Sequence, residues 1–351
     1  MNILIIGGGN FMGSALLDML LLDQPERFNV TVVSRDRRHW GDRVSARPRV
    51  RHIKADRRDK YELLHALSEH CADEPNRPRF CVDFCAYDVD DVEPLVGFLR
   101  DLGCHYVFIS TDSVYEVCDT DRDALRLESH AVRPTSEAER AQLRRCDQYG
   151  DDKLQCEEWL QAHAGLAWTA LRLPDVFGPR DATKRHWCYQ LLVKLQDERP
   201  VQLSAKERRR KLSFVFSRDV ARAVLAVFER AAAAANQSFN LACVEAVTLE
   251  EYLELVAAAL GKGALRVEQL ADDDDNELQF LPSVSERAGV LDIGKAQRAL
   301  AFAPTPLAAA VRETVEWHER AWHEHRRERP ELEELDARWH TRLAELYGGG
   351  D

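Results

Sequence analysis

Tyr149 and Lys153 have the residue types and the spacing of a proton-transfer pair. A free tyrosine titrates at about pH 10, and a nearby ammonium group stabilises its phenolate, so that the hydroxyl can act as an acid or a base. Residues four apart lie on one face of a helix. Because the pair heads a helical pattern that continues from Leu154 to Gln161, we expect the two side chains to be neighbours.

Polar side chains follow a run that we expect to be a buried strand, Tyr106 to Ser110. They are Thr111, Asp112 and Ser113. Open α/β sheets hold their ligands at the carboxyl ends of their strands. A hydroxyl at this edge is therefore expected to bind the same substrate oxygen as Tyr149.

A glycine-rich turn, Gly7-Gly8-Gly9-Asn10-Phe11-Met12-Gly13, follows the first expected strand and opens a helix. Free backbone N–H groups and the helix dipole make such a turn suited to a pyrophosphate. Gly7 permits the tight turn and Gly13 permits close helix packing, whereas Asn10 stands where glycine is usual. Asparagine tolerates positive φ, so we still expect the turn to form. The predicted phosphate-binding residues are Gly7, Gly9, Asn10, Phe11, Met12 and Gly13.

The end of the second expected strand bears on the choice of dinucleotide. An acidic residue there bonds the ribose 2′-hydroxyl of NAD, whereas arginine accepts the 2′-phosphate of NADP. The chain has Ser34, Arg35 and Asp36 at this point. Hydroxyl and guanidinium hydrogen bonds from Ser34 and Arg35 favour NADP. NAD stays open as the alternative, because Asp36 can swing in.

The elements that position these residues follow from short β-branched runs that alternate with helix-period stretches up to about residue 173. This alternation predicts an α/β fold with a Rossmann-like, doubly wound parallel sheet. The expected strands are Asn2 to Ile6, Val30 to Val33, Val50 to Lys54, Phe80 to Cys85, Tyr106 to Ser110 and Trp168 to Leu173.

A smaller lobe is expected beyond Gly178-Pro179, where the alternation loosens. We expect residues 1–181 to form the dinucleotide-binding domain, with residues 213–242 returning to it. Residues 182–212 and 243–320 then form a discontinuous C-terminal substrate lobe, in which Thr248 caps a helix from Leu249 to Leu260. Residues 321–351 are dense in glutamate and arginine, which predicts a charged helix, exposed or bound to a partner.

Composition excludes several classes of protein. A formal net charge of −12 argues against strong affinity for nucleic acids or anionic membranes. No apolar run approaches the roughly 18 residues that cross a bilayer, and the first residues already form a strand, so we expect a cytoplasmic protein. The nine cysteines include no CxxC pair, which indicates reduced thiols. We assign no metal site, and we treat Asp272 to Asp275 as a solvated loop.

With these motifs in order, the chain resembles the extended short-chain dehydrogenase/reductase family, in its NAD-dependent epimerase/dehydratase group. The resemblance covers residues 1 to about 320. It depends on the glycine turn, on the run from Ala55 to Asp59, and on three longer motifs. These are ISTDSVY at 109–115, YGDDK at 149–153 and LRLPDVFGPR at 171–180.

The resemblance implies a role for each matching residue. Thr111 is implied as the hydroxyl partner of Tyr149, Lys153 as the residue that orients the nicotinamide ribose, and Asp56 as a contact of adenine. Pro174 is implied to line the nicotinamide pocket, and Asp112 matches the acid of the sugar-nucleotide dehydratases. The family also implies NAD or NADP as cofactor, a small-molecule substrate and a homodimer.

Two departures from the family pattern bear on the substrate. Ser113 stands where the dehydratases carry the glutamate base, so we expect hydride transfer, alone or reversed as epimerisation, rather than water loss. Leu212 stands where relatives often place an arginine that holds a diphosphate; Arg210 and Lys211 beside it are candidate substitutes, with a solvated surface cluster as the alternative. His186 is a further candidate substrate contact.

Two functional hypotheses follow. The first is an NADP- or NAD-dependent oxidoreductase or epimerase-like enzyme acting on a hydroxyl or carbonyl of a sugar or sugar-nucleotide-like substrate, with Tyr149 as the acid or base. The second is a catalytically silent dinucleotide sensor, scaffold or RNA-associated protein on the same fold. Asn10, Ser113 and the charged tail favour the second, whereas the retained Tyr149, Lys153 and Thr111 favour the first.

Overall fold

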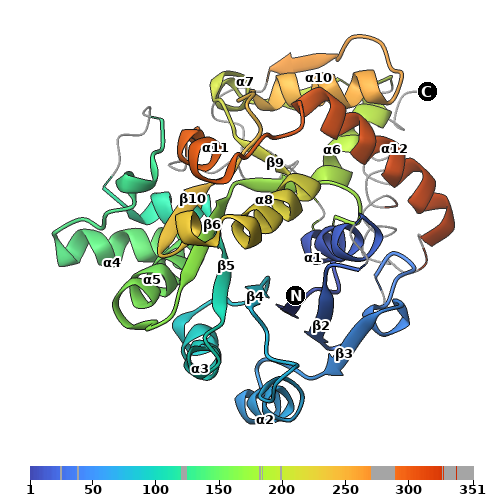
Figure 1. Ribbon diagram of the computed structural model, residues 1–351. Helices are drawn as coiled ribbons and strands as arrows, with labels where there is room; N and C mark the ends of the chain where they lie inside the picture. Colours follow the sequence, from blue (N-terminus) through green and yellow to red (C-terminus); the bar gives the residue numbers. More distant parts are fainter. Residues whose placement is uncertain are drawn as a thin grey trace.

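A seven-stranded parallel sheet forms the centre of the molecule, with the strand order β10-β6-β5-β4-β1-β2-β3 (Figure 1). The computed structural model describes residues 1–23, 26–37, 39–119, 125–181, 183, 185–197, 200–269, 289–325, 327 and 337. The strands of the sheet are β1 (Asn2–Ile6), β2 (Asn29–Ser34), β3 (Val50–Lys54), β4 (Phe80–Asp83), β5 (His105–Thr111), β6 (Trp168–Leu173) and β10 (Gln237–Asn240). The predicted Rossmann-like, doubly wound sheet is therefore confirmed.

Each face of the sheet carries its own helices, because alternate side chains of a strand point to opposite faces. Ile3 and Ile5 pack in a core with α1 (Phe11–Asp18) and α8 (Ser217–Glu229). Leu4 and Ile6 pack in a second core on the other face. The helices of that face are α2 (Lys60–Cys71), α3 (Val89–Asp101) and α5 (Gln148–His163). Burial on both faces explains why an inner strand such as β1 is an almost continuous apolar run.

The chain leaves the sheet to build a second lobe, which has its own core. Figure 1 shows α7, α10 and α12 of this lobe together beyond one end of the sheet. Its elements are β7 (Asp175–Phe177), α6 (Arg185–Lys194), β8 (Val201–Leu203), α7 (Ala205–Arg209), β9 (Phe214–Phe216), α10 (Leu249–Ala259), β11 (Val267–Gln269) and α12 (Leu307–His325). The remaining helices are α4 (Glu137–Cys146), α9 (Ala231–Ala234) and α11 (Gly294–Leu300).

The start of α10 agrees with the expected cap, Thr248. Thr248 Oγ1 accepts from the Glu251 amide at 3.2 Å, and the Glu251 carboxylate accepts from the Thr248 amide at 2.7 Å. This capping box starts α10 where the sequence predicts it. Most of the charged tail expected over residues 321–351, like the run from Asp272 to Asp275, lies outside the described residues.

All nine cysteines are thiols rather than disulfides. Within the ranges that the structure describes, no group of three or more His, Cys, Asp or Glu residues is placed to hold a metal ion. Among those same residues, no helix combines the length and the apolar character needed to cross a membrane.

Candidate active site

The glycine turn closes so tightly that side chains are excluded from it. Gly7 has a φ of 82°, and a Cβ there would lie 2.7 Å from Cys85 Sγ. A Cβ on Gly13 would lie 2.6 Å from the Cα of Gly8. This second contact is with backbone, which cannot rotate away, so α1 can approach the turn only with glycine at position 13.

Besides Gly7, the residue of the turn with a positive φ is Phe11 and not Asn10. Asn10 has an extended φ of −130° and forms the N-cap of α1, so the expectation that it uses its tolerance of positive φ was wrong. Phe11 adopts a φ of 42° although its side chain is bulky and only 6% exposed. Burial of the Phe11 side chain is what holds the backbone in this disfavoured conformation.

The first turn of α1 has the open amino end that an anion requires. The Asn10 side chain makes no capping hydrogen bond, and the first turn contains no acidic residue. Backbone N–H groups at such a helix start need an acceptor. The glycine cradle and the uncapped helix therefore fit a pyrophosphate, which brings Gly7, Gly9, Asn10, Phe11, Met12 and Gly13 together as a candidate phosphate site.

Ser34, Arg35 and Asp56 gather at the ends of β2 and β3. Arg35 Nη1 lies 3.8 Å from Asp56 Oδ2, and both side chains are largely exposed. Asp36 is bonded within the loop that follows β2: Ser45 Oγ donates to its carboxylate at 2.6 Å, and the Ser45 amide donates to it at 3.1 Å. Hydrogen bonding by the Ser45 side chain lowers the pKa of Asp36. The Asp36 carboxylate therefore forms hydrogen bonds within the loop that contains it.

Tyr149 and Lys153 both lie on α5, near its amino end. Lys153 Nζ donates to the carbonyl oxygens of Ala86 and Ile109, each at 2.7 Å. It lies 5.9 Å from the centre of the Tyr149 ring. Tyr149 itself is 45% exposed, whereas Lys153 is 4% exposed. The predicted pair is therefore assembled, with a buried ammonium group close to a partly exposed tyrosine.

Gly150 explains how α5 comes so close to the end of β5. A Cβ on Gly150 would lie 2.2 Å from the carbonyl oxygen of Ser113. The Gly150 amide also donates to Asp147 Oδ1 at 2.8 Å, and this bond caps the amino end of α5. The small residue between Tyr149 and Lys153 lets the helix start pack directly on the Thr111 to Ser113 turn.

The protonation of the pair is set by burial. Burial raises the pKa of Tyr149 to about 12, with the Thr111 hydroxyl opposing this shift and Tyr87, Asp112 and Asp147 adding to it. Burial lowers the pKa of Lys153 to about 8. Around neutral pH, Tyr149 therefore holds its proton and Lys153 still carries its charge.

Asp112 lies in an acidic part of the site. Thr111 Oγ1 is 3.5 Å from Asp112 Oδ1, and it accepts from the Ser113 amide at 3.2 Å. Burial, followed by the carboxylates of Asp175 and Glu116, raises the pKa of Asp112 well above its ordinary value. Asp112 therefore lies next to Thr111 in surroundings that disfavour its charged form.

Two residues of the site escaped the sequence analysis. The ring of Tyr87 lies 6.4 Å from the ring of Tyr149 and is 56% exposed. Arg185 forms an ion pair with Asp175 of the LRLPDVFGPR motif. Tyr87 follows β4 by four residues, so the rule that ligands bind at the carboxyl ends of strands could have found it. Arg185 begins α6 and had no such signal.

The structure does not gather the other candidate substrate residues around Tyr149. His186 is 1% exposed within the second lobe, where its Nδ1 is 2.9 Å from the Tyr252 hydroxyl. Burial lowers its pKa to about 3, so it is a neutral core residue. Lys211 Nζ donates to Glu251 at 2.7 Å, and Arg210 beside it is half-buried. Pro174 is buried directly after β6.

A buried polar network anchors α5 to the sheet. The Glu157 carboxylate accepts from Arg172 Nη2 at 2.7 Å, from Ser110 Oγ at 2.6 Å and from Ser238 Oγ at 2.8 Å. Arg172 Nη1 also donates to the Tyr115 hydroxyl at 2.9 Å. These bonds join α5 to β5, β6 and β10, and so they fix the register of the helix that carries Tyr149.

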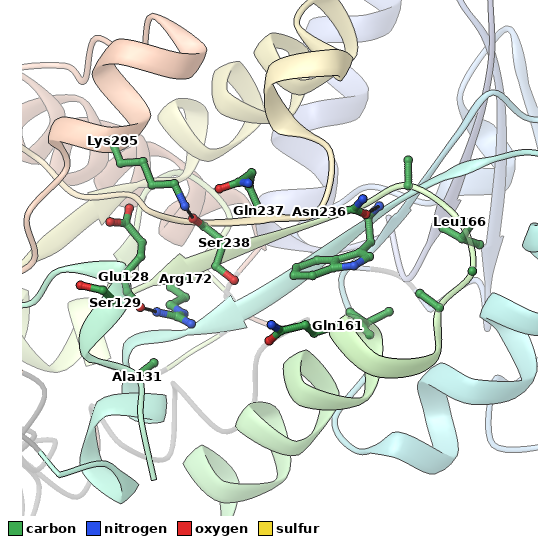
Figure 2. Close-up of a pocket in the computed structure, with 15 residues that line it drawn as sticks. Glu128, Ser129, Ala131, Gln161, Leu166, Arg172, Asn236, Gln237, Ser238 and Lys295 are labelled. Atoms are coloured by element: carbon green, nitrogen blue, oxygen red, sulfur yellow. Dashed lines mark hydrogen bonds between the residues drawn. The ribbon is translucent and has the colours of Figure 1, made fainter.

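The outer side of this network borders a groove of about 1060 Å³ between α5 and the edge strand β10. Figure 2 shows Glu128, Arg172, Ser238 and Lys295 at one end of the groove, with Gln161 and Leu166 at the other. Lys295 Nζ donates to the Ser238 carbonyl at 2.8 Å. The groove reaches Trp168, the first residue of β6, and is separate from the edge where Thr111 lies.

Solved structures with the same fold align over nearly the whole chain. Bacillus anthracis dTDP-glucose 4,6-dehydratase in complex with NAD is 17% identical, with a TM-score of 0.68 over 92% of this chain and 98% of that chain. Thermus thermophilus UDP-glucose 4-epimerase in complex with NAD is 23% identical, with a TM-score of 0.67 over 91% and 99%. At these identities the likeness shows a shared fold.

Another structure with this fold is Thermotoga maritima UDP-glucose 4-epimerase with UDP-glucose, which is 20% identical, with a TM-score of 0.67 over 91% of this chain and 99% of that chain. No curated protein sequence matches at a significant level. The family model described as the NAD dependent epimerase/dehydratase family matches residues 3–242, from β1 to just beyond β10. Because this match spans well over half of the sequence, the chain belongs to the NAD-dependent epimerase/dehydratase family of enzymes.

Proposed function

We propose that this enzyme transfers a hydride between a nicotinamide dinucleotide and a hydroxyl-bearing or carbonyl carbon of a sugar or sugar-nucleotide-like substrate, and that Tyr149 exchanges the proton. One observation carries the proposal: an exposed phenol, a buried ammonium 5.9 Å from its ring and the Thr111 side chain meet at the carboxyl end of β5. The glycine turn that fits a pyrophosphate follows β1 in the same parallel sheet.

The bound dinucleotide supplies the hydride acceptor or donor. The protein's residues then have separate tasks. Tyr149, with its raised pKa, holds a proton that it can give to a carbonyl oxygen during reduction. During oxidation the charge of Lys153 stabilises the phenolate, and two carbonyl oxygens keep its ammonium in place. The Thr111 hydroxyl, which lies 3.5 Å from Asp112 Oδ1, orients the reacting oxygen.

NADP is the cofactor that we propose the enzyme prefers. The bonds from Ser45 support this preference, because they hold Asp36 away from the ribose position. Arg35 lies at the end of β2 with its side chain 51% exposed, and a 2′-phosphate there competes with Asp56 for its guanidinium. Asp56 then serves the adenine end, and Pro174 the nicotinamide end, as the family resemblance implies.

Oxidoreduction or epimerisation suits the site better than dehydration. Ser113 provides no carboxylate base for water loss. Leu212 forms a backbone bridge with Val247, and its side chain packs against the apolar core of the second lobe. Lys211 is engaged by Glu251, so a diphosphate must compete with this ion pair for it. We therefore assign no diphosphate clamp to Arg210 and Lys211.

A silent sensor or scaffold on the same fold is the weaker proposal. Burial of the Lys153 ammonium lowers its pKa, which means that the native state is less stable than it would be with an apolar side chain there. A protein without proton chemistry gains nothing from this cost. Retention of Lys153 beside Tyr149 and Thr111 therefore favours the enzyme.

Two measurements test the proposal. Calorimetry with NAD, NADH, NADP and NADPH should show binding, with NADP tighter than NAD. The protein is then incubated with NADP or NAD and a panel of sugars, sugar alcohols and nucleotide sugars, and reduced nicotinamide is followed by absorbance. Binding without reduction by any member, together with no epimer formed in product analysis, would favour the silent scaffold.

The cell compartment and the assembly complete the proposal. Nine thiols without a disulfide are typical of a reducing compartment, which supports a cytoplasmic location. The family resemblance supports a homodimer. Sedimentation of the full chain at several concentrations distinguishes a dimer from a monomer.

A further inference from the structure

Trp40 has a backbone conformation that its side chain disfavours. Its φ is 49°, in the left-handed region, and Gly41 follows it with a φ of 79°. Bulky residues enter this region only where their surroundings over-determine them, and such positions cluster at functional sites. Trp40 lies in the segment between β2 and β3, residues 35–37 and 39–49, which we name the ribose loop.

Helix α12 of the second lobe holds Trp40 in place. The Trp40 ring is 3% exposed and meets Trp317 edge-on at 5.2 Å and His318 edge-on at 5.5 Å. Its Nε1 donates to the Asp181 carbonyl at 3.3 Å. At Gly41, a Cβ would lie 2.5 Å from the imidazole of His325, at the end of α12. In Figure 1 the red helix α12 runs down toward the blue segment that follows β2.

The same loop also contacts the glycine turn. Val44 is 2% exposed, and its Cγ2 lies 3.2 Å from the position of a Cβ on Gly9. Arg47 Nη1 donates to Asp18 of α1 at 2.7 Å, and its Nε donates to Asp42 at 2.9 Å. The ribose loop therefore bridges α12 and the helix that starts at the candidate phosphate site.

Ser45 connects this bridge to the choice of dinucleotide. It lies next to Val44 and holds Asp36, whose own φ is 54°. If Trp40 leaves its place, the ribose loop loses its ring contacts with α12, and the position of the Asp36 carboxylate then depends on Ser45 and Arg43. A carboxylate at the ribose edge repels a 2′-phosphate and accepts from a 2′-hydroxyl.

We infer that Trp40 is a specificity-determining positioning residue, through which α12 fixes the ribose loop so that the adenosine end of the dinucleotide meets Arg35 rather than Asp36. The inference depends on the proposed function, because it assigns a cause to the NADP preference. It also makes the second lobe part of the cofactor site.

The test uses two probes that carry only the adenosine end: adenosine 2′,5′-bisphosphate and adenosine 5′-monophosphate. Dissociation constants are measured by calorimetry for the full-length protein and for Trp40→Ala, Trp40→Phe and Trp322→Ala. Trp322 is the matched control, since it lies on the same helix but packs on Trp187 at 4.5 Å. Circular dichroism and thermal melts check that each variant folds.

We expect the wild type to prefer the bisphosphate, and Trp40→Ala to weaken bisphosphate binding about tenfold with little change for the monophosphate. Trp40→Phe and Trp322→Ala should keep the preference within about twofold. An unchanged preference in folded Trp40→Ala overturns the inference. If Trp40→Ala does not fold, Trp317→Ala decides in the same way, because Trp317 is half-buried and contacts Trp40.

Failure of the proposed function gives a different result. In that case the wild type binds neither probe and no dinucleotide, whatever stands at position 40. Wild-type binding without any preference between the two probes removes the NADP assignment and, with it, this inference.

Discussion

Glu157 and Arg172 form a buried ion pair, with 2.7 Å between Glu157 Oε2 and Arg172 Nη2, one helical turn beyond Lys153. The Glu157 side chain is 5% exposed and the Arg172 side chain is 6% exposed. Burial alone would raise the pKa of Glu157, but Arg172, Ser110 and Ser238 lower it overall. The pair therefore stays charged and holds α5 on the sheet.

Removal of one partner of this buried pair should lower the free energy of unfolding more than the loss of a surface ion pair does. Arg172→Met leaves the Glu157 carboxylate buried without its cation, which costs about 3–5 kcal/mol. Lys211→Met breaks the exposed pair with Glu251 and should cost at most about 1 kcal/mol. Urea unfolding of the two variants measures the difference. Equal losses would mean that the buried pair does not stabilise the helix.

Lys153 should give the protein a stability that rises with pH in the alkaline range. Burial lowers its folded-state pKa from 10.5 to about 8. Between these values the unfolded chain binds a proton that the native protein lacks, so the free energy of unfolding increases with pH. Relative to Lys153→Met, the wild type should gain about 2 kcal/mol from about pH 7 to about pH 10.

The difference between wild type and Lys153→Met is the quantity to measure, because the titration of groups away from Lys153 cancels in it. Urea unfolding of both proteins at several pH values gives this difference in the free energy of unfolding. A difference that stays constant with pH would show that the Lys153 ammonium is not desolvated.

The glycine turn should be intolerant of a side chain at Gly13. Gly13→Ala places a Cβ 2.6 Å from the Gly8 Cα, so the variant should lose about 1–3 kcal/mol of stability and its dinucleotide affinity. Gly97→Ala is the control: Gly97 lies in α3 with nothing within 4 Å of its Cβ position. It should gain about 0.5–1 kcal/mol. Thermal melts and calorimetry compare the two, and similar behaviour would contradict the assigned cradle.

Arg35 should distinguish NADP from NAD. A charge-assisted bond to a 2′-phosphate is worth about 1.5–3 kcal/mol, so Arg35→Ala should weaken NADP binding by roughly 10-fold to 100-fold. NAD binding should change by less than about twofold, since NAD lacks that phosphate. Arg37→Ala, exposed in the same run, is the control. Equal losses for both dinucleotides in Arg35→Ala would remove its role at the ribose.

The sequence predicted the sheet and the catalytic pair because both depend on local patterns. Each predicted strand lies within two residues of its observed bounds, for example Phe80 to Cys85 against Phe80–Asp83. Strands buried on both faces are apolar throughout, which leaves a strong signal. Tyr149 and Lys153 were visible because a helix converts a spacing of four into proximity.

Contacts between distant segments left no such signal. Trp40 meets Trp317 and Asp36 meets Ser45 only because of how the loop between β2 and β3 folds. Backbone angles at the glycine turn were also hidden, so positive φ was expected near Asn10 when it falls at Phe11. His186 resembled a site residue by its place in the sequence, but packing of α6 buries it.

Replacement of Tyr149 with phenylalanine, compared with the same change at Tyr87, tests the central claim most directly. The two rings are 6.4 Å apart and similarly exposed, but of the two hydroxyl groups it is that of Tyr149 which interacts with Thr111. With a substrate from the panel, Tyr149→Phe should lower turnover by about 10²-fold to 10⁴-fold while dinucleotide affinity is kept. Tyr87→Phe should stay within about tenfold of wild type. A Tyr149→Phe variant that turns over at the wild-type rate would contradict the account.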